Sequence, residues 1–192
     1  MIRFDIRFSI AQNKVIIPHY DAKGNLVGIR GRAFDPWEVE NIGKYIPVKV
    51  EGNWYSHPLG MNLYGLYENR KKISEYGVVY VFEGEKSVLK LDDFSFPNLG
   101  VAVCGSNFNK YQLNILMQEV RPREIILCFD KENDTKKEKY FDKLKGIADK
   151  YKNYCKFSFI YDTKGLLDLK DSPVDKGEAV FRELLASRVR VR

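Results

Sequence analysis

Apolar segments alternate with charged, helix-like segments in the second part of the chain. The apolar segments occupy residues 78–82, 99–105, 124–130 and 156–162, and the last helix-like segment occupies residues 178–187. Continuous apolar runs are typical of strands buried on both faces, and strands separated by helices are typical of a parallel sheet. We therefore predict an α/β fold, in which a four-stranded parallel sheet carries helices on both faces.

The first part of the chain follows a different pattern. Two strand-like runs, 15–20 and 26–34, are separated by a polar turn, and this spacing predicts a β-hairpin. An irregular stretch rich in Gly and Pro follows, and a helix is predicted over 63–76, where Gly77 stops it.

These patterns divide the chain into two parts. Residues 1–76 form a smaller mixed α/β subdomain, which is basic because it holds 11 Lys+Arg against 8 Asp+Glu. Residues 77–192 form the domain with the parallel sheet and the C-terminal helix.

Composition limits the class of protein. The 192 residues are 44% hydrophobic and 30% charged, a balance typical of a folded globular protein, and the formal net charge is +6. A membrane-spanning helix needs roughly 18 or more consecutive apolar residues, and the chain has no such run. We therefore expect no membrane association and a cytoplasmic location.

Cysteine usage argues against a zinc site of the usual kind. The three cysteines do not form a CxxC pair, and the chain holds only two histidines. Cys104, Cys128 and Cys155 stand in apolar surroundings, where we expect buried, reduced thiols.

Acidic residues follow three of the four predicted strands. Glu83 follows the first strand, Asp130 ends the third and Asp162 ends the fourth. Further acids lie just beyond these positions: Glu132 and Asp134, and then Asp168, Asp171 and Asp175. Parallel strands present their carboxyl ends at one edge of the sheet, and a group of carboxylates there suits Mg²⁺. An acid at a strand end can instead cap the following helix, and the pattern alone leaves both interpretations open.

Two segments resemble a known family. The stretch VVYVFEGEKSVLKL is similar to the first motif of TOPRIM domains, with Glu83 and Gly84 as its Glu-Gly pair. The stretch IILCFDKEND is similar to the second motif, an Asp-x-Asp, with Asp130 and Glu132 at the two acidic positions. Glu132 differs from the usual aspartate by one methylene group.

The order of further motifs resembles the catalytic core of DnaG-type bacterial and phage primases over about residues 14–187. The matching features are the hairpin ending in Gly31-Arg32, the Lys44-Tyr45 pair, the Leu-Tyr-Gly-Leu segment at 63–66 and Gly105. The segment KDSPVDKGEAVFRELL is similar to the family's Asp-Pro-Asp motif, and Asp171 and Asp175 are the nearest matches.

The resemblance implies a DNA primase, which uses Mg²⁺ or Mn²⁺ to make short RNA primers from ribonucleoside triphosphates on a single-stranded DNA template. It implies that Glu83, Asp130 and Glu132 are catalytic and bind metal, with Asp171 and Asp175 as further metal ligands. It also implies that Arg30, Arg32 and Lys44 contact nucleic acid or nucleotide. The family's zinc-binding module and its region for the replicative helicase have no counterpart in this chain, which is thus expected to be an excised or stand-alone core.

Two other functions are compatible with the same residues. A TOPRIM nuclease would use the same metal site to activate water. A non-catalytic TOPRIM module of a phage or mobile element would bind nucleic acid without turnover, and the Glu132 and Asp171–Asp175 departures from the motifs favour this alternative.

Overall fold

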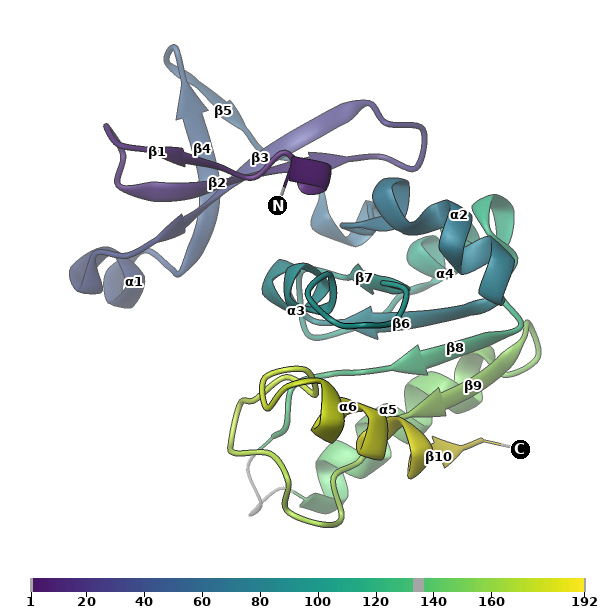
Figure 1. The fold of residues 1–192 in the computed structure, drawn as a ribbon. Coiled ribbons are helices and arrows are strands. Elements are labelled where there is room, and N and C mark those ends of the chain that lie inside the picture. Colours follow the sequence, from purple (N-terminus) through teal and green to yellow (C-terminus); the bar gives the residue numbers. More distant parts are fainter. Residues whose placement is uncertain (1, 133–136, 192) are drawn as a thin grey trace.

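The computed structural model describes residues 2–132 and 137–191, which form two five-stranded sheets (Figure 1). Asp134, one of the candidate acids, lies outside the described residues. The first sheet is antiparallel throughout and its strands pair in chain order. Its strands are β1 (Arg7–Ser9), β2 (Lys14–Tyr20), β3 (Leu26–Ala33), β4 (Tyr45–Val50) and β5 (Asn53–Tyr55).

The predicted hairpin is formed by β2 and β3. Asp21 begins the turn, and its carboxylate accepts hydrogen bonds from the backbone N–H groups of Lys23 and Asn25 at 2.8 and 2.9 Å. Gly24 adopts a φ of 94°, a left-handed conformation that glycine tolerates best. The turn residues therefore fix the register of β2 against β3.

The second sheet has the strand order β10-β9-β8-β6-β7. Its strands are β6 (Val78–Phe82), β7 (Gly100–Ala102), β8 (Glu124–Leu127), β9 (Lys156–Phe159) and β10 (Val189–Arg190). β6 to β9 are the predicted parallel strands, whereas β10 is antiparallel and was not predicted. β10 forms because Val189 and Val191 pack on the core while Arg188 is tied to Glu124 by an ion pair of 2.9 Å.

Helices cover both faces of the parallel sheet, as predicted (Figure 1). The helices are α1 (Pro36–Asn41), α2 (Leu66–Tyr76), α3 (Glu85–Leu91), α4 (Lys110–Glu119), α5 (Lys137–Tyr151) and α6 (Glu178–Ala186), and two short 3₁₀ helices lie at Ile2–Phe4 and Leu59–Met61. α2, α4 and α5 bury side chains in one hydrophobic core, and α3 and α6 bury theirs in the other. Alternation of buried strands and amphipathic helices therefore builds a three-layer domain.

The helix α2 packs on the parallel sheet, although its sequence was placed in the first subdomain. Leu66 and Ile73 are fully buried in the core beneath α2, and Tyr64 pairs with Ala102 across an isolated bridge. Packing on the second sheet thus begins before residue 77. The division at 76/77 itself stays a prediction.

The strand order reverses direction at β6. β6 lies between β7 and β8, and the connection through α3 runs on the opposite face from the connections through α4 and α5. At such a reversal of direction, the loops after the two central strands separate and leave room for a ligand. The residues that follow β6 and β8 therefore face the most favourable position for a site.

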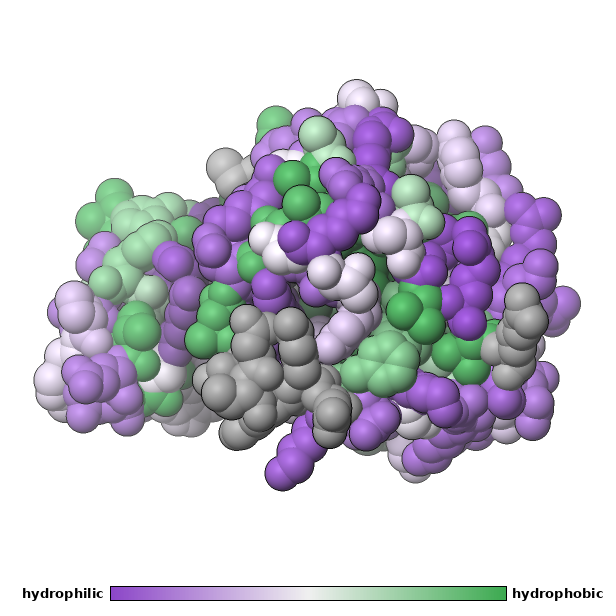
Figure 2. All heavy atoms as spheres, turned by 90° about the horizontal axis from the view of Figure 1, so that it is seen from below, coloured by the Kyte–Doolittle hydropathy of each residue, from purple (hydrophilic) through white to green (hydrophobic). Residues whose placement is uncertain are grey.

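Seen from below, hydrophilic residues cover most of the face formed by the C-terminal half, with smaller hydrophobic areas between them (Figure 2). Among the helices within 2–132 and 137–191, none has the length and apolar character needed to span a bilayer.

Candidate active site

Glu83 and Asp130 lie at the carboxyl ends of the adjacent strands β6 and β8. Glu83 directly follows β6, and Asp130 follows the buried pair Cys128 and Phe129 that extends the chain beyond β8. One oxygen of each carboxylate, Oε1 of Glu83 and Oδ1 of Asp130, is buried and has no hydrogen-bond partner within the described part of the chain. Buried oxygens of this kind are costly unless a further group binds them.

Both carboxylates have raised pKa values, chiefly because they are buried. Burial, and next the charge of Asp130, raise the pKa of Glu83 to about 7. Burial likewise raises the pKa of Asp130 to about 6, and Lys86 opposes that shift. The charge of Glu132 acts in the same direction on both acids, so all three lie within electrostatic range of one another.

Glu132 is held by a lysine from another loop. Its Oε2 forms an ion pair with Nζ of Lys170 at 2.9 Å, and the Lys170 side chain is 65% exposed. The pKa of Lys170 is raised, chiefly by this hydrogen bond to Glu132. Lys170 therefore contributes an exposed positive charge beside the acids, which sequence analysis did not identify.

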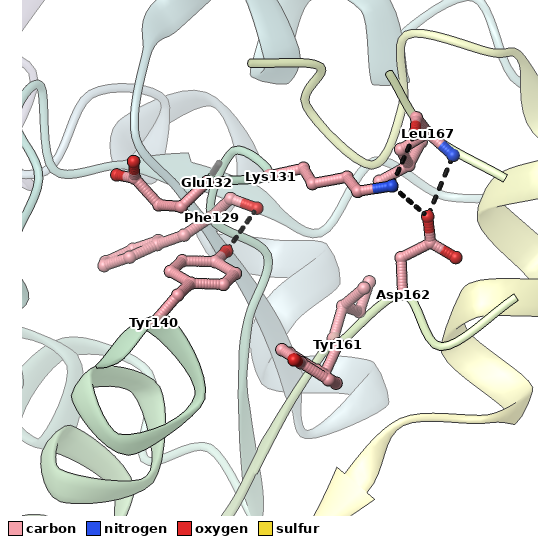
Figure 3. Close-up of a pocket in the computed structure, with 8 residues that line it drawn as sticks. Phe129, Lys131, Glu132, Tyr140, Tyr161, Asp162 and Leu167 are labelled. Atoms are coloured by element: carbon pink, nitrogen blue, oxygen red, sulfur yellow. Dashed lines mark hydrogen bonds and ion pairs between the residues drawn. The ribbon is translucent and has the colours of Figure 1, made fainter. Parts of the chain in front are cut away.

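A small pocket beside Glu132 shows how this segment is fixed (Figure 3). The ammonium of Lys131 points away from Glu132 and reaches the carboxylate of Asp162 at 3.1 Å and the carbonyl of Leu167 at 2.7 Å. The Tyr140 hydroxyl donates to the carbonyl of Phe129 at 3.2 Å. The pocket has room for about one water molecule, roughly 20 Å³, so it is packing around the site and not a ligand cavity.

Asp162 holds a loop and takes no part in the acid group. Its side chain is 2% exposed, and it accepts hydrogen bonds from the backbone N–H groups of Leu166 and Leu167 at 3.0 and 2.9 Å. Backbone hydrogen bonds in both directions then join Lys131 to residues 170–171. Asp162 therefore anchors the loop that delivers Lys170 to Glu132.

Asp171 and Asp175 are engaged elsewhere. Asp175 receives ion pairs from Lys86 at 2.8 Å and Lys90 at 2.9 Å. Asp171 accepts from the backbone N–H of Asp168 at 2.9 Å and pairs with Lys176 at 3.2 Å. Asp175 lies close enough to influence Asp130 electrostatically, whereas Asp171 is not among the charges that act most strongly on Glu83 or Asp130.

The three predicted basic residues have different surroundings. Arg30 is only 14% exposed and donates to Glu85 at 2.6 Å and to the carbonyl of Tyr45 at 3.1 Å. Arg32 stacks on the ring of Phe34, with 4.9 Å from its guanidinium carbon to the ring centre. Lys44 is exposed, and its ammonium has no recorded hydrogen bond or ion pair to the residues the structure describes. Arg32 and Lys44 are thus available to a ligand, whereas Arg30 joins the two sheets.

A larger cavity of about 190 Å³ lies between the first sheet and α3. Arg32 and Tyr45 line it from the first sheet, and Lys86 and Lys90 line it from α3. Lys86 and Lys90 were missed by sequence analysis. Their spacing by four residues on the helix after Glu83 was the signal, because it places both on one helix face beside the strand end.

The acids at the strand ends offer the kind of donor atom that a divalent cation prefers. Glu83 and Asp130 each offer a buried, unpartnered oxygen, and Glu132 offers a third carboxylate within range. Mg²⁺ and Mn²⁺ prefer oxygen ligands of this kind. Neutralisation by a cation would also offset the cost of buried negative charge, which raises both pKa values.

Solved structures with the same architecture include the catalytic domains of primases. The zinc-binding and RNA polymerase domains of the Aquifex aeolicus primase align with a TM-score of 0.68 and 23% identity, covering 93% of this chain and 41% of that one. A DnaG primase catalytic domain bound to ssDNA aligns with a TM-score of 0.67 and 21% identity, covering 92% of this chain and 52% of that one. The chain therefore has the fold of the catalytic core of DnaG-type primases.

Sequence comparison gives relatives of two kinds. The SPbeta prophage-derived uncharacterized protein YorJ of Bacillus subtilis is 37% identical over 190 residues, which are 92% of this chain and 50% of YorJ. The DNA primase of Neisseria meningitidis is 32% identical over 122 residues, which are 62% of this chain and 18% of that primase. No family model matches the chain. The resemblance to DnaG-type primases is thus shown, and the chain spans half or less of the length of these relatives.

Proposed function

We propose that the chain is the catalytic core of a primase, a TOPRIM-type nucleotidyltransferase that makes short RNA primers on single-stranded DNA. One observation carries the proposal: in a primase core fold, Glu83 and Asp130 present buried, unpartnered carboxylate oxygens at adjacent strand ends. A single buried acid of this type would not by itself indicate a metal site. A pair of them at the ends of adjacent parallel strands is an arrangement that suits a divalent cation.

Glu83, Asp130 and Glu132 would hold Mg²⁺ or Mn²⁺. Such an ion orients the phosphates of a nucleotide and neutralises the charge that develops during phosphoryl transfer. Glu83 has a pKa of about 7 in the metal-free protein, so it is also the carboxylate best matched to proton transfer near neutral pH. Lysines already neutralise the carboxylates of Asp171 and Asp175. These two residues would therefore hold the loop beside the acids in place and would not be direct metal ligands.

The substrates would approach from the side of the first sheet. Arg32 and Lys44 would contact the template or the incoming ribonucleotide, and the ammonium groups of Lys86 and Lys90 would face the triphosphate across the shared cavity. Arg30 would act indirectly, through the ion pair that fixes the first sheet on α3.

Extension of a short RNA annealed to a DNA template tests the proposal without requiring initiation. With Mn²⁺ or Mg²⁺, we expect the wild-type chain to add ribonucleotides and Glu83→Gln to lose at least 100-fold in rate. Glu119→Gln, a substitution of an exposed glutamate at the end of α4, is the matched control and should retain full activity.

The products separate the competing functions. Longer RNA supports a polymerase, whereas shortened DNA with no RNA extension would show a nuclease. A wild-type chain that binds Mn²⁺ and single-stranded DNA but gives neither product would favour the non-catalytic module. Full extension by Glu83→Gln would refute the assigned site.

A further inference from the structure

A second group of metal-ligand side chains lies away from the strand-end acids. His19 Nε2, a carboxylate oxygen of Glu85 and Cys104 Sγ all lie within 4.8 Å of one another. They come from β2, from the first turn of α3 and from the loop after β7, so the group joins the two sheets. His19 and Glu85 are each 1% exposed.

A second histidine lies next to this group. The imidazole of His57 lies 4.9 Å from that of His19, centre to centre, and its Nε2 is buried without a hydrogen-bond partner among the described residues. Gly28 makes room for this ring, because a Cβ at Gly28 would lie 2.2 Å from Nδ1 of His57. Burial lowers the pKa of His57 to about 4, which keeps the ring neutral, as a ligand must be.

We propose that His19, His57, Glu85 and Cys104 form a binding site for a zinc-class transition metal, separate from the Mg²⁺ or Mn²⁺ site. Two nitrogens, one sulfur and one oxygen are ligands that select zinc, whereas the oxygen-only set around Glu83 selects magnesium or manganese. Zinc–ligand bonds of about 2.0–2.3 Å place ligand atoms roughly 3.5 Å apart. His19 Nε2 and Glu85 Oε1 are already 3.2 Å apart, and the other pairs lie within 4.8 Å, so those pairs would close by about 1 Å at most.

Arg30 fits this site as the group that orients Glu85. Its NH1 lies 2.6 Å from Oε1 of Glu85, and the same oxygen lies 3.2 Å from Nε2 of His19. A metal would replace the contact between His19 and Glu85, while Arg30 keeps its own contact with the carboxylate. The charge of Arg30 also acts on the Cys104 thiol and opposes the rise of its pKa. Positive charge beside the site is tolerable because the metal would meet two anionic ligands, the carboxylate and the thiolate.

Metal binding at this site includes a proton release. Burial raises the pKa of the Cys104 thiol well above its ordinary value, so the thiol is protonated in the metal-free chain. Formation of the metal–sulfur bond breaks the S–H bond, and the proton leaves to solvent. Cys104 and His57 are the partly exposed members of the set and provide the path of entry.

The site escaped sequence analysis because its members are far apart along the chain. Zinc motifs are recognised by two close pairs of ligands, and here no two of the four positions are close neighbours. A bound metal would pin β2 and the His57 loop of the first part onto α3 and the end of β7. It would therefore fix how the two sheets are placed against each other. One of its ligands, Glu85, is only two residues after Glu83.

Elemental analysis of the full chain, purified with zinc present and dialysed into metal-free buffer, tests the proposal. We expect one zinc per chain, lost in Cys104→Ser and in His19→Gln. Cys155→Ser and Glu83→Gln are the matched controls and should retain it. No zinc in the wild-type chain would overturn the proposal, and so would loss of zinc in Glu83→Gln alone, which would place the ion at the strand-end acids.

A second measurement does not depend on any variant folding. Co²⁺ added to the metal-free wild-type chain should give a thiolate-to-metal charge-transfer band and release about one proton. Absence of this band would overturn the proposal even if Cys104→Ser is unstable. Neither readout requires primer synthesis, so the metal site and the proposed primase function can fail independently.

Discussion

At the scale of single residues, two buried carboxylates determine the chemistry of the strand-end site. Glu83 and Asp130 have oxygens that the described part of the protein leaves without hydrogen-bond donors, although lysines stand nearby at Lys86 and Lys170. A fold that needed these acids only for stability would pair them, as it pairs Glu124 with Arg188 at 2.9 Å. Their unpaired state is therefore the residue-level argument for a ligand.

The raised pKa of Glu83 predicts how stability depends on pH in the metal-free protein. The pKa is about 7 when folded and 4.5 for the free side chain, so the folded chain binds more protons between these values. The contribution of Glu83 to the free energy of unfolding is then largest below about pH 4.5. It falls as the pH rises to about 7, because ionisation of this carboxyl is opposed only in the folded state. The loss from this residue is about 2 kcal/mol after allowance for its partial solvent exposure.

Chemical denaturation with a chelator present, at a series of pH values, measures this effect. Subtracting the curve of Glu83→Gln from that of the wild type should isolate the fall between about pH 4.5 and pH 7. Glu119→Gln should follow the wild type throughout, and Mg²⁺ should reduce the wild-type fall by stabilising the ionised carboxylate. Parallel curves for wild type and Glu83→Gln in the chelator would contradict the prediction.

At the scale of elements, the junction between α2 and β6 controls where the strand that carries Glu83 begins. Gly77 ends α2 with a φ of 67°, and its carbonyl accepts from the backbone N–H groups of Arg123 and Glu124 at 2.8 and 3.1 Å. A Cβ at Gly77 would lie 2.5 Å from Nε of Arg123. One glycine thus ends a helix and aligns β6 with the start of β8.

Gly77→Ala should therefore destabilise the protein by about 1–2 kcal/mol, from the left-handed backbone and the displaced Arg123 side chain. Gly146→Ala is the matched control, because Gly146 lies inside α5 with nothing within 4 Å of the added Cβ. That substitution should stabilise the protein by up to about 1 kcal/mol through helix propensity. Urea unfolding measures both, and equal effects of the two substitutions would show that the backbone at Gly77 is unstrained.

The sequence predicted an element with its correct bounds where the buried residues are also the residues that pair in the sheet. The strand at 78–82 was predicted with its observed bounds, whereas the strand predicted at 124–130 ends at Leu127. Cys128 and Phe129 are buried without continuing the paired strand, and burial alone gives the same apolar pattern as a strand. The short α1 was missed, although Asp35 caps it and Pro36 occupies its first turn, both recognisable signals.

The site was predictable only in part, for a related reason. Glu83 and Asp130 could be predicted as candidates because the sequence defines where a strand ends, and adjacent parallel strands bring their ends together. Lys170 reaches Glu132 through a loop whose path depends on Asp162, and the His19, Glu85 and Cys104 group requires two sheets to be packed together. No local pattern along the chain encodes either arrangement.

At the scale of the whole molecule, charge is organised by contacts between the two sheets. Ion pairs join Arg30 to Glu85 and Arg3 to Asp92, which seats the first sheet on α3. The same arrangement places Arg32 of the first sheet opposite Lys86 and Lys90 of α3. Three basic side chains from the two parts of the chain therefore line one cavity where the two sheets meet, together with Asp92 and Asp93.

This arrangement predicts a salt-dependent affinity for single-stranded DNA. Each phosphate contact that is lost should reduce the slope of log K against log salt by about 0.7, and it should weaken binding at low salt by roughly tenfold or less. We expect such changes for Arg32→Ala and for Lys44→Ala. Lys145→Ala, a substitution of an exposed lysine on α5 paired with Asp149, should leave both slope and affinity unchanged.

Fluorescence anisotropy of a labelled oligonucleotide at several salt concentrations measures these slopes. The double variant of Arg32 and Lys44 should lose about twice the slope of either single variant, because counterion release adds over separate contacts. Equal weakening by Lys145→Ala would mean that binding follows net charge and not the junction of the two sheets. The path of the template would then have to be sought on another face, and the proposed approach of the substrates from the first sheet would fail with it.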